Sequence, residues 1–343
     1  MSMAVLPPSE PTMKALVYTA PKNLDFQDMP DPVPEDGEVL VKVDAVGICG
    51  SDMHAYLGHD ERRPAPLILG HEVAGTVVEG PSEGTRVVVN PLVTCGKCEA
   101  CLQGRTNICP YRQIISMPPR EGGFAGLLRM PERNLHTIPA SFSTESAALT
   151  EPVACGWHAV RLARDASRTP LSACRAVVLG GGAIGLGAAL VLVARGVQEI
   201  FIAETNPARH PVLREAGPFT VYDPSSDKGP EPGSAHIVVD GFGGAATRKA
   251  ASELATPGSV IVHIGLADGE GGLDVRRMTL QEITFIGTYT YSAADFGDAL
   301  AAMMAGQLGA LDWAEVRPLE QGQQAFTDIL DGRAAAPKIV LRP

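Results

Sequence analysis

The sequence lacks a surplus of positive charge. Its 28 Lys and Arg residues are outnumbered by 39 Asp and Glu residues, so the 343-residue chain carries a formal net charge of −11. Nucleic acids and anionic membranes bind basic surfaces, which displace counterions or meet lipid headgroups. We therefore expect neither a nucleic acid nor a membrane as a partner.

Features of an exported protein are also missing. The N-terminal segment MSMAVLPPSEP has neither a basic start nor an apolar core, so we expect no secretion signal and a cytoplasmic protein. Seven cysteines, an odd number, do not suit a disulfide framework in a chain of this length. The apolar run 177–194 is interrupted by five glycines, and we interpret it as a strand, a turn and a helix of a buried sheet rather than a membrane span.

The length predicts two domains, and the composition, with 45% hydrophobic and 20% charged residues, is ordinary for packed globular proteins. In the first part, Val39, Val41 and Val43 alternate with polar residues, and Gly/Pro clusters separate β-branched runs, as in an antiparallel, barrel-like domain. After about Glu151, strand-like segments such as AHIVVD alternate with Ala-rich helical segments such as AATRKAASELA. This rhythm is typical of a doubly wound parallel sheet.

The fold class is therefore α/β plus β. We predict a flexible extension over 1–12, a first domain over 13–152 and 290–343, and a second domain over 153–289. A helix (AADFGDALAAMMAG) and a last strand (PKIVL) beyond Phe285 are expected to rejoin the first domain.

Four cysteines occur within one short loop at the spacing Cys-x2-Cys-x2-Cys-x7-Cys: Cys95, Cys98, Cys101 and Cys109. Four thiolates so close in sequence can surround one zinc ion at about 2.3 Å without long-range folding. Iron–sulfur proteins use other spacings, so the loop predicts a structural zinc site.

A glycine motif, Gly180-x-Gly182-x-x-Gly185, directly follows a predicted strand and opens a predicted helix. Such glycines allow a tight turn, the approach of a pyrophosphate and close helix–strand packing. Glu204 ends the next strand, 24 residues after Gly180, where a carboxylate would accept the ribose hydroxyls and repel a 2′-phosphate. NAD is therefore favoured over NADP, although Arg209 could instead bind that phosphate or lie against the adenine.

Cys49, His71 and a nearby carboxylate form a mixed sulfur, nitrogen and oxygen set in the first domain. Three such protein ligands leave a fourth zinc position open, which is the pattern of a catalytic site rather than a structural one.

The chain resembles the zinc-dependent medium-chain dehydrogenases/reductases of the alcohol dehydrogenase superfamily, nearest to the sorbitol, threonine and butanediol dehydrogenase branch. The motifs that carry the resemblance follow one another in order from about Met13 to the C-terminus: GEVLVKV, GICGSDMH, GHEVAGTVVEG, the four-cysteine loop, GGFA, TEPVACGWHAV and VLGGGAIG. The resemblance implies a GroES-like catalytic domain, a Rossmann domain, one catalytic and one structural zinc ion, NAD, and a homodimer or homotetramer.

It also implies roles for particular residues. Cys49 and His71 correspond to ligands of the catalytic zinc, and either Glu72 or Glu151 supplies the third protein ligand. Asp52 corresponds to an acceptor for the zinc-bound imidazole, although an Asx turn would suit the same position.

Zinc lowers the pKa of an alcohol as it lowers that of water, and the released proton needs a route to solvent. Ser51 and His54 resemble the family's proton relay, although Ser51 could instead cap a helix and His54 line a wall. The resemblance also suggests contacts to the cofactor from these residues: Ile184, Arg209, Ile264, Gly265, Leu266, Thr288 and Tyr289.

One departure limits the substrate. Thr290 stands where sorbitol-type relatives have an arginine that contacts a polyol. Tyr56 and His59 are expected near the pocket, although 59–63 would more commonly be a solvated loop.

The sequence thus predicts a zinc- and NAD-dependent oxidoreductase that interconverts a small secondary alcohol (a diol, a polyol, or an amino or hydroxy alcohol) and its ketone. The alternatives are an NADP-preferring member of the same family and a non-catalytic zinc- and nucleotide-binding regulator.

Overall fold

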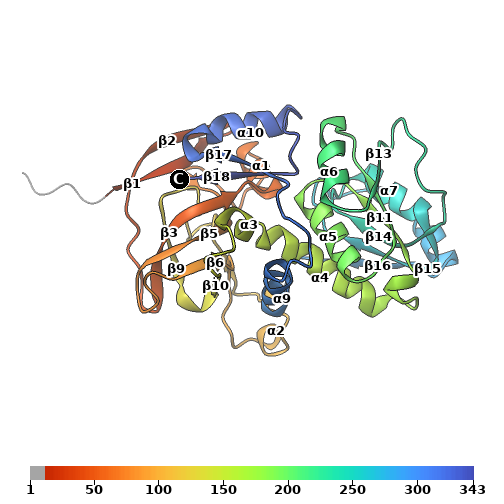
Figure 1. Cartoon of the computed structure of the whole chain (residues 1–343), viewed down its shortest axis with the longest axis horizontal. Helices are drawn as coiled ribbons and strands as arrows, with labels where there is room; N and C mark the ends of the chain where they lie inside the picture. The colour runs from red at the N-terminus through yellow and green to blue at the C-terminus, as the bar shows by residue number, and fades with distance from the viewer. Residues whose placement is uncertain (1–11) are drawn as a thin grey trace, which may run out of the picture.

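The computed structural model describes residues 12–343, which form two β-sheet units with helices packed around them (Figure 1). The predicted extension therefore lies outside the described residues, apart from Thr12. Thr12 begins the first strand and pairs with Pro30, so regular structure starts one residue before the predicted Met13.

The larger sheet of the first unit has the strand order β10-β6-β5-β3-β18-β17, and β9 also pairs with β3. Its strands are β3 (Glu38–Gly47), β5 (Glu72–Glu79), β6 (Arg86–Val89), β9 (Leu127–Pro131), β10 (Leu135–Thr137), β17 (Ala314–Pro318) and β18 (Lys338–Arg342). As predicted, Val39, Val41 and Val43 of β3 are buried while Lys42 between them is exposed. The sheet is mixed rather than purely antiparallel, because β17 and β18 run parallel to each other.

Two small sheets complete the strands of this unit. One contains β2 (Asn23–Pro30), β1 (Thr12–Ala20) and β4 (Leu67–Ile68), and the other contains β7 (Leu92–Val93) and β8 (Gln113–Ile114). The helices associated with the first unit are α1 (Gly50–Tyr56), α2 (Glu99–Leu102), α3 (Thr144–Ala148) and α10 (Gly322–Leu330). Because β18 pairs with β3, the end of the chain returns to the first unit as expected.

The second unit is a six-stranded, fully parallel sheet with the order β13-β12-β11-β14-β15-β16. Its strands are β11 (Arg175–Leu179), β12 (Glu199–Ala203), β13 (Thr220–Tyr222), β14 (Ala235–Asp240), β15 (Ala255–His263) and β16 (Thr284–Gly287). The intervening helices are α5 (Ala183–Ala194), α6 (His210–Ala216), α7 (Ala245–Leu254) and α8 (Val275–Leu280). Numbered along the chain the strand order is 3-2-1-4-5-6, which is the Rossmann order, with ligands expected where the order reverses, between β11 and β14.

The apolar run 177–194 is the buried strand β11, the glycine turn and helix α5, as predicted. Within residues 12–343, none of the helices has the length and apolar character that crossing a membrane requires.

Two helices lie between the units in Figure 1, α4 (Thr150–Ala166) and α9 (Ala293–Met304). They are joined by a buried polar cluster in which Asp295 accepts hydrogen bonds from Arg161 Nε at 2.6 Å and Ser292 Oγ at 2.6 Å, and lies 2.7 Å from His158 Nδ1. Burial alone would raise the pKa of Asp295, but the bonds from His158 and Arg161 outweigh it and hold that pKa well below its usual value.

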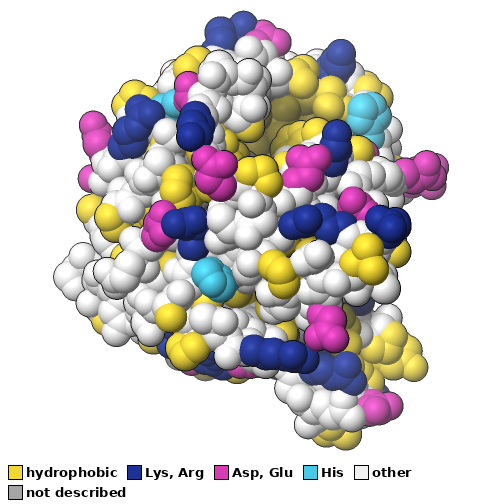
Figure 2. Space-filling view, turned by 90° about the vertical axis from the view of Figure 1, so that its right-hand side faces the viewer, with side chains coloured by type: hydrophobic (Ala, Val, Ile, Leu, Met, Phe, Trp, Pro, Cys, Tyr) yellow, Lys and Arg dark blue, Asp and Glu magenta, His cyan; other side chains and the backbone are white. Residues whose placement is uncertain are grey.

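The face shown in Figure 2 has acidic and basic side chains interspersed, with a hollow lined largely by hydrophobic side chains near its upper edge. Neither sign of charge gathers into one patch on that face.

Candidate active site

A cavity of about 460 Å³ contains most of the residues predicted for catalysis and many of those predicted for cofactor binding. The lining residues from the first unit include Cys49, Ser51, His54, His71 and Glu151. From the second unit come Ile184, Ile264, Gly265, Leu266, Thr288 and Tyr289. The two sets therefore face one common space, although they are far apart in sequence.

The start of α1 positions Cys49. The Cys49 backbone N–H donates to Asp52 Oδ2 at 2.9 Å, which satisfies an amide at the helix N-terminus. The other carboxylate oxygen, Oδ1, lies 3.5 Å from His71 Nδ1. Asp52 therefore serves both interpretations made from the sequence, as a turn-forming acceptor and as a neighbour of the imidazole. Ser51 is not the cap of this helix, because Cys49 occupies that position.

Cys49, His71 and Glu72 form a group whose possible ligand atoms all lie within 4.8 Å of one another. Glu72 is completely buried, and its Oε1 accepts a hydrogen bond from Lys338 Nζ at 2.5 Å. The other oxygen, Oε2, is buried and has no hydrogen-bond partner. An unpaired buried carboxylate oxygen beside a thiol and an imidazole is well suited to a zinc ion.

Glu151, in the first turn of α4, lines the same cavity but lies outside this group of three. Its pKa is raised to about 7, chiefly by burial, and the Glu72 charge contributes in the same direction. Cys155, to which the sequence motifs assign no role, also lines the cavity, and its Sγ lies 4.0 Å from Glu151 Oε1. The buried Tyr291 is a further neighbour, and burial together with the Glu151 charge raises the pKa of its hydroxyl well above the usual value.

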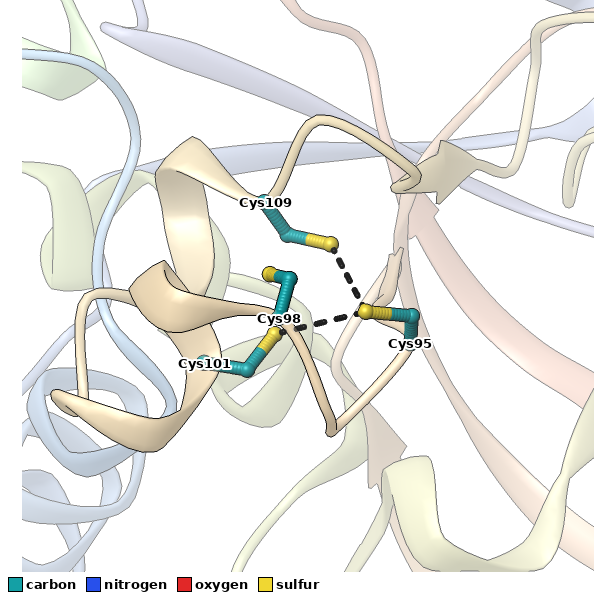
Figure 3. Close-up of side chains that lie close together, drawn as sticks. All are labelled: Cys95, Cys98, Cys101 and Cys109. Atoms are coloured by element: carbon teal, nitrogen blue, oxygen red, sulfur yellow. Dashed lines mark hydrogen bonds between the residues drawn. The ribbon is translucent and has the colours of Figure 1, made fainter.

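The side chains of the four cysteines in the predicted structural zinc site point toward one another, as Figure 3 shows. Their sulfur atoms all lie within 4.8 Å of one another, and Cys95 Sγ lies 3.6 Å from Cys109 Sγ and 4.0 Å from Cys101 Sγ. Backbone hydrogen bonding near Lys97 is the main cause that lowers the pKa of Cys95 to about 6. A thiolate is the form that binds zinc, and four sulfurs leave no position for a substrate.

This loop also braces the cavity wall. Asn107 Nδ2, from the 3-10 helix Thr106–Ile108, donates to the Tyr289 carbonyl at 2.8 Å, and Thr106 Oγ1 accepts from the Ala293 amide at 2.8 Å. The cysteine loop therefore holds the segment that contributes Thr288, Tyr289 and Thr290 to the cavity.

The glycine motif has the geometry expected for a dinucleotide. Gly180 has a φ of +98°, and a Cβ at Gly185 would lie 1.9 Å from the Gly180 carbonyl oxygen. Nothing lies within 4 Å of a Cβ position on Gly182, which forms the N-cap of α5. The turn therefore offers an open helix N-terminus to an anionic group.

Glu204 is buried beneath this turn rather than extended into solvent. Its Oε2 accepts from the Gly181 amide at 3.0 Å, and its Oε1 accepts from the Asn206 amide at 2.7 Å. Arg209 Nη1 lies 3.5 Å from Glu204 Oε2, so the two residues that bear on the choice of cofactor form an ion pair.

The sequence interpretation missed the loop after β14. Its residues Gly241 and Phe242 line the cavity, as does Ala267 in the loop after β15. The fully buried Asp240 accepts from the Phe242 and Gly243 amides at 3.2 and 2.8 Å. An acidic residue at the end of a buried strand, followed by the glycine-rich GFGG, was the available signal.

The loop 59–63 belongs to the cavity wall, since His59, Asp60, Arg62 and Arg63 all line it. The loop is also partly solvated, as the alternative interpretation expected, since the Arg62 side chain is 60% exposed. Tyr56 is buried behind the wall, and its hydroxyl accepts from Gln323 Nε2 at 2.9 Å.

Comparisons with known proteins agree with this geometry. Residues 35–140 match the family model described as "Alcohol dehydrogenase GroES-like domain", and residues 183–305 match "Zinc-binding dehydrogenase". The chain is 33% identical to an L-galactonate-5-dehydrogenase of Escherichia coli K12 over 313 residues, covering 87% of this chain and 89% of that one.

Two further similarities agree. A sorbitol dehydrogenase of Bacillus subtilis is 38% identical over 215 residues, 60% of this chain and 59% of that one. The crystal structure of 2R,3R-butanediol dehydrogenase from Bacillus subtilis superposes with a TM-score of 0.83 at 27% identity, covering 96% of this chain and 99% of that chain.

Proposed function

The chain belongs to the zinc-binding alcohol dehydrogenase family, and from this premise we propose that it interconverts a small secondary alcohol and its ketone, with hydride transfer to or from NAD. The observation that carries the proposal is the single cavity into which both units project. One side supplies a buried set of sulfur, nitrogen and oxygen ligands, and the other supplies residues that follow the strands of a Rossmann sheet.

In this proposal Cys49, His71 and Glu72 hold the catalytic zinc. Glu151, which lines the same cavity, is the alternative third ligand that the family resemblance implies. When bound there, zinc supplies a positive charge that lowers the pKa of an alcohol. Asp52 orients His71, and Lys338 orients Glu72 by binding the carboxylate oxygen that the metal does not need. The four-cysteine loop holds the structural zinc.

In the proposed reaction, Ser51 and His54 transfer the proton of the alcohol. Both line the cavity from α1, and an imidazole is suited to proton transfer because its ordinary pKa lies near neutral pH. We propose that the proton passes from the substrate oxygen through Ser51 to His54 and then to solvent.

The glycine turn binds the pyrophosphate. The cavity residues of the second unit orient the nicotinamide, namely Ile184, Ile264, Gly265, Leu266, Thr288 and Tyr289. We propose NAD rather than NADP because Arg209, a basic group beside the Glu204 carboxylate, is already paired with it. A 2′-phosphate would have to displace this contact and lie against a negative charge.

For the whole chain we propose the domain limits 13–152 with 290–343 and 153–289, in a cytoplasmic homodimer or homotetramer. The edge strand β16 supports an assembly, because an edge strand presents unpaired backbone groups to a second copy.

The proposed function is tested with rates on diols, polyols, threonine and simple secondary alcohols, each with NAD and with NADP, on protein whose zinc content is measured. We expect close to two zinc ions per chain and turnover with NAD. One zinc ion per chain with no turnover on any alcohol would instead favour a non-catalytic regulator, and faster turnover with NADP would overturn the choice of cofactor.

A further inference from the structure

The cavity wall carries a basic cluster that the proposed reaction does not use. Arg62 and Arg63 lie on the loop between α1 and β4, and both line the cavity together with Asp60 and His59. In a chain with a net charge of −11, two adjacent arginines in the wall of the active-site cavity call for an explanation.

Asp60 neutralises only one of the two guanidinium groups. Its Oδ1 accepts from Arg62 Nε at 2.8 Å, and its Oδ2 accepts from Arg62 Nη2 at 3.0 Å and from Arg63 Nη1 at 2.5 Å. Burial acts to raise the pKa of Asp60, but these bonds outweigh it and lower the pKa to about 2, so the carboxyl is ionised at neutral pH. Within this group of three residues, two positive charges and one negative charge leave one positive charge in excess.

Arg63 brings this excess charge close to the proposed metal ligands. Its side chain is only 3% exposed, and its Nε donates to the Ser116 carbonyl at 3.0 Å. Ser116 Oγ in turn lies 3.4 Å from His71 Nδ1. The Arg63 charge is also among the causes that keep the pKa of the buried Asp52 low.

Arg62 also lines the cavity and is accessible to solvent. Its side chain is 60% exposed, and Tyr289, another wall residue, is among the groups whose charge raises the pKa of Arg62. On the Tyr289 ring lies a third guanidinium, that of Arg112, with its central carbon 4.8 Å from the ring centroid. The acidic groups among the cavity-lining residues are Asp60, which is already paired, and Glu151, which lies by the proposed metal ligands.

From this arrangement we propose that the substrate is an anionic secondary alcohol, a polyhydroxy carboxylic acid whose carboxylate is received by Arg62 and Arg63. The inference rests on the proposed function, since it names the substrate class of the same site. A guanidinium has donors only and binds a carboxylate through parallel hydrogen bonds, and one carboxylate matches the single excess charge. A neutral polyol would leave that charge unmatched, and a phosphate monoester would carry up to one negative charge too many.

The reaction is the same as for a neutral alcohol. The carbinol C–H bond breaks and its electron pair passes as hydride to NAD, the O–H proton leaves through Ser51 and His54, and a C=O bond forms. The carboxylate takes no part in this redox step and serves to orient the carbon chain, so Arg62 and Arg63 are binding residues rather than catalytic ones.

The test compares five- and six-carbon aldonates with the alditols and alditol monophosphates of matching configuration, as substrates of the zinc-loaded enzyme with NAD. We expect kcat/KM for the best aldonate to exceed that of its alditol by about 30-fold, the range for hydrogen bonds between charged groups. Arg62→Met should lower this ratio by at least about tenfold. Arg62→Lys should lower it less, because lysine keeps the positive charge although it cannot form the paired hydrogen bonds of a guanidinium. The control Arg164→Met, at an exposed arginine of α4 outside the cavity wall, should leave the ratio unchanged.

Calorimetric titration gives a second readout that does not need turnover. The aldonate is titrated into the protein–NADH complex, and NADH into the free protein, for the natural protein and for Arg62→Met. We expect the variant to lose affinity for the aldonate and to keep its affinity for NADH.

Four results would overturn the inference: equal rates on aldonates and alditols, a preference for the phosphates, a ratio insensitive to Arg62, or a loss confined to NADH, which would assign the arginine to the cofactor. Turnover of neutral alcohols but not of aldonates would refute this inference and would still support the proposed function. If no alcohol or acid were oxidised, the proposed function would fail, and selective aldonate binding would still decide whether the arginines receive a carboxylate.

Discussion

Glu72 and Glu151 are two glutamates beside the same cavity, and their surroundings give them different properties. Glu72 is paired with Lys338 and keeps one free oxygen beside Cys49 and His71. Glu151 is buried without a basic hydrogen-bond partner, which raises its pKa to about 7. Glu72 is the carboxylate with an oxygen within 4.8 Å of the Cys49 and His71 ligand atoms, so we favour Glu72 as the third protein ligand.

Cys49→Ser should abolish turnover while the protein still folds and binds NADH, because the variant removes one ligand from an open metal site. Metal analysis should then give about one zinc ion per chain, held by the four-cysteine loop. The matched control is Cys174→Ser, at a buried cysteine outside the active-site cavity, which should keep both ions and full activity. Substantial activity in Cys49→Ser would refute the assigned metal site.

Glu204→Gln should weaken NAD far more than NADP, by about 10- to 100-fold, because a charged acceptor for the ribose hydroxyls is lost. Gln is preferred to Ala because its one amide oxygen keeps an acceptor for either the Gly181 or the Asn206 amide, which donate to different oxygens of Glu204. Affinities measured by calorimetry should be unchanged in the control Glu199→Gln, a residue at the exposed start of β12. An equal loss for both cofactors would mean that Glu204 does not contact the ribose.

For individual residues, the sequence motifs predicted those contacts whose two partners lie close together in the sequence. Cys49 and Asp52 share one helix turn, and the four cysteines share one loop, so their spacing alone brings them together. The partners of Glu72 and Glu151 were not predicted, because Lys338 and Tyr291 come from distant segments with no motif of their own.

The loop of four cysteines acts as a structural element, since Asn107 and Thr106 tie it to the segment that follows β16. Cys98→Ser should therefore lower the thermal midpoint or disrupt assembly first, because it opens a closed zinc site. The chemical step should persist in the fraction that stays folded. Unchanged stability together with complete loss of turnover would contradict the roles given to the two zinc sites, and Cys49→Ser provides the opposite pattern for comparison.

The contact between α4 and α9 depends on Asp295, whose pKa is lowered in the folded state. A group whose pKa falls on folding adds stability above its unfolded pKa of about 3.9, and this stability is lost as the pH drops below that value. Asp295→Asn should thus cost about 1–3 kcal/mol at pH 7, because Arg161 and His158 lose a charged acceptor.

Thermal midpoints of this variant and the natural protein should differ by a constant amount from about pH 5 to 9 and converge only as the pH falls below about 4. The control Asp298→Asn changes a neighbouring acidic residue of the same helix, at a position outside the His158–Arg161 cluster, and should shift the midpoint little. A gap that widened on acidification would contradict the sign of the pKa shift.

Elements with a clear period were predicted from the sequence, including β3, β14, α7 and α9. Helix α4 was recognised only as a motif with a ligand in it, because nearly all its residues from Thr150 to Val160 are buried and it lacks a polar face over that stretch. The parallel pairing of β17 with β18 could not be predicted either, since strand direction depends on long-range contacts that the local pattern does not contain.

At the scale of the whole molecule, the last strand completes the site built by the first part of the chain. Lys338, the first residue of β18, reaches Glu72 266 positions earlier and also donates to the Ile48 carbonyl at 2.8 Å. Burial acts to lower the pKa of Lys338, but the Glu72 charge outweighs it and the ammonium stays protonated.

Lys338→Met should lower stability by about 3–5 kcal/mol and weaken zinc binding at the catalytic site, because it leaves a buried carboxylate without its counter-ion. The double variant Lys338→Met/Glu72→Gln should recover most of the stability but not the activity. Thermal midpoints and zinc content measured on the three proteins separate these effects. No recovery in the double variant would mean that Lys338 stabilises the sheet independently of Glu72.

The chain passes between the two sheets twice, once at the start of α4 and once after β16 (Figure 1). A body attached to another at two points keeps only one easy rotation, about the line through those points. The first crossing carries Glu151 and the second carries Thr288–Thr290, so the cavity residues on both crossings lie near the axis of any such motion. Opening and closing of the cavity would therefore leave the residues on the two crossings nearly still, while parts of each unit farther from that line moved by larger amounts.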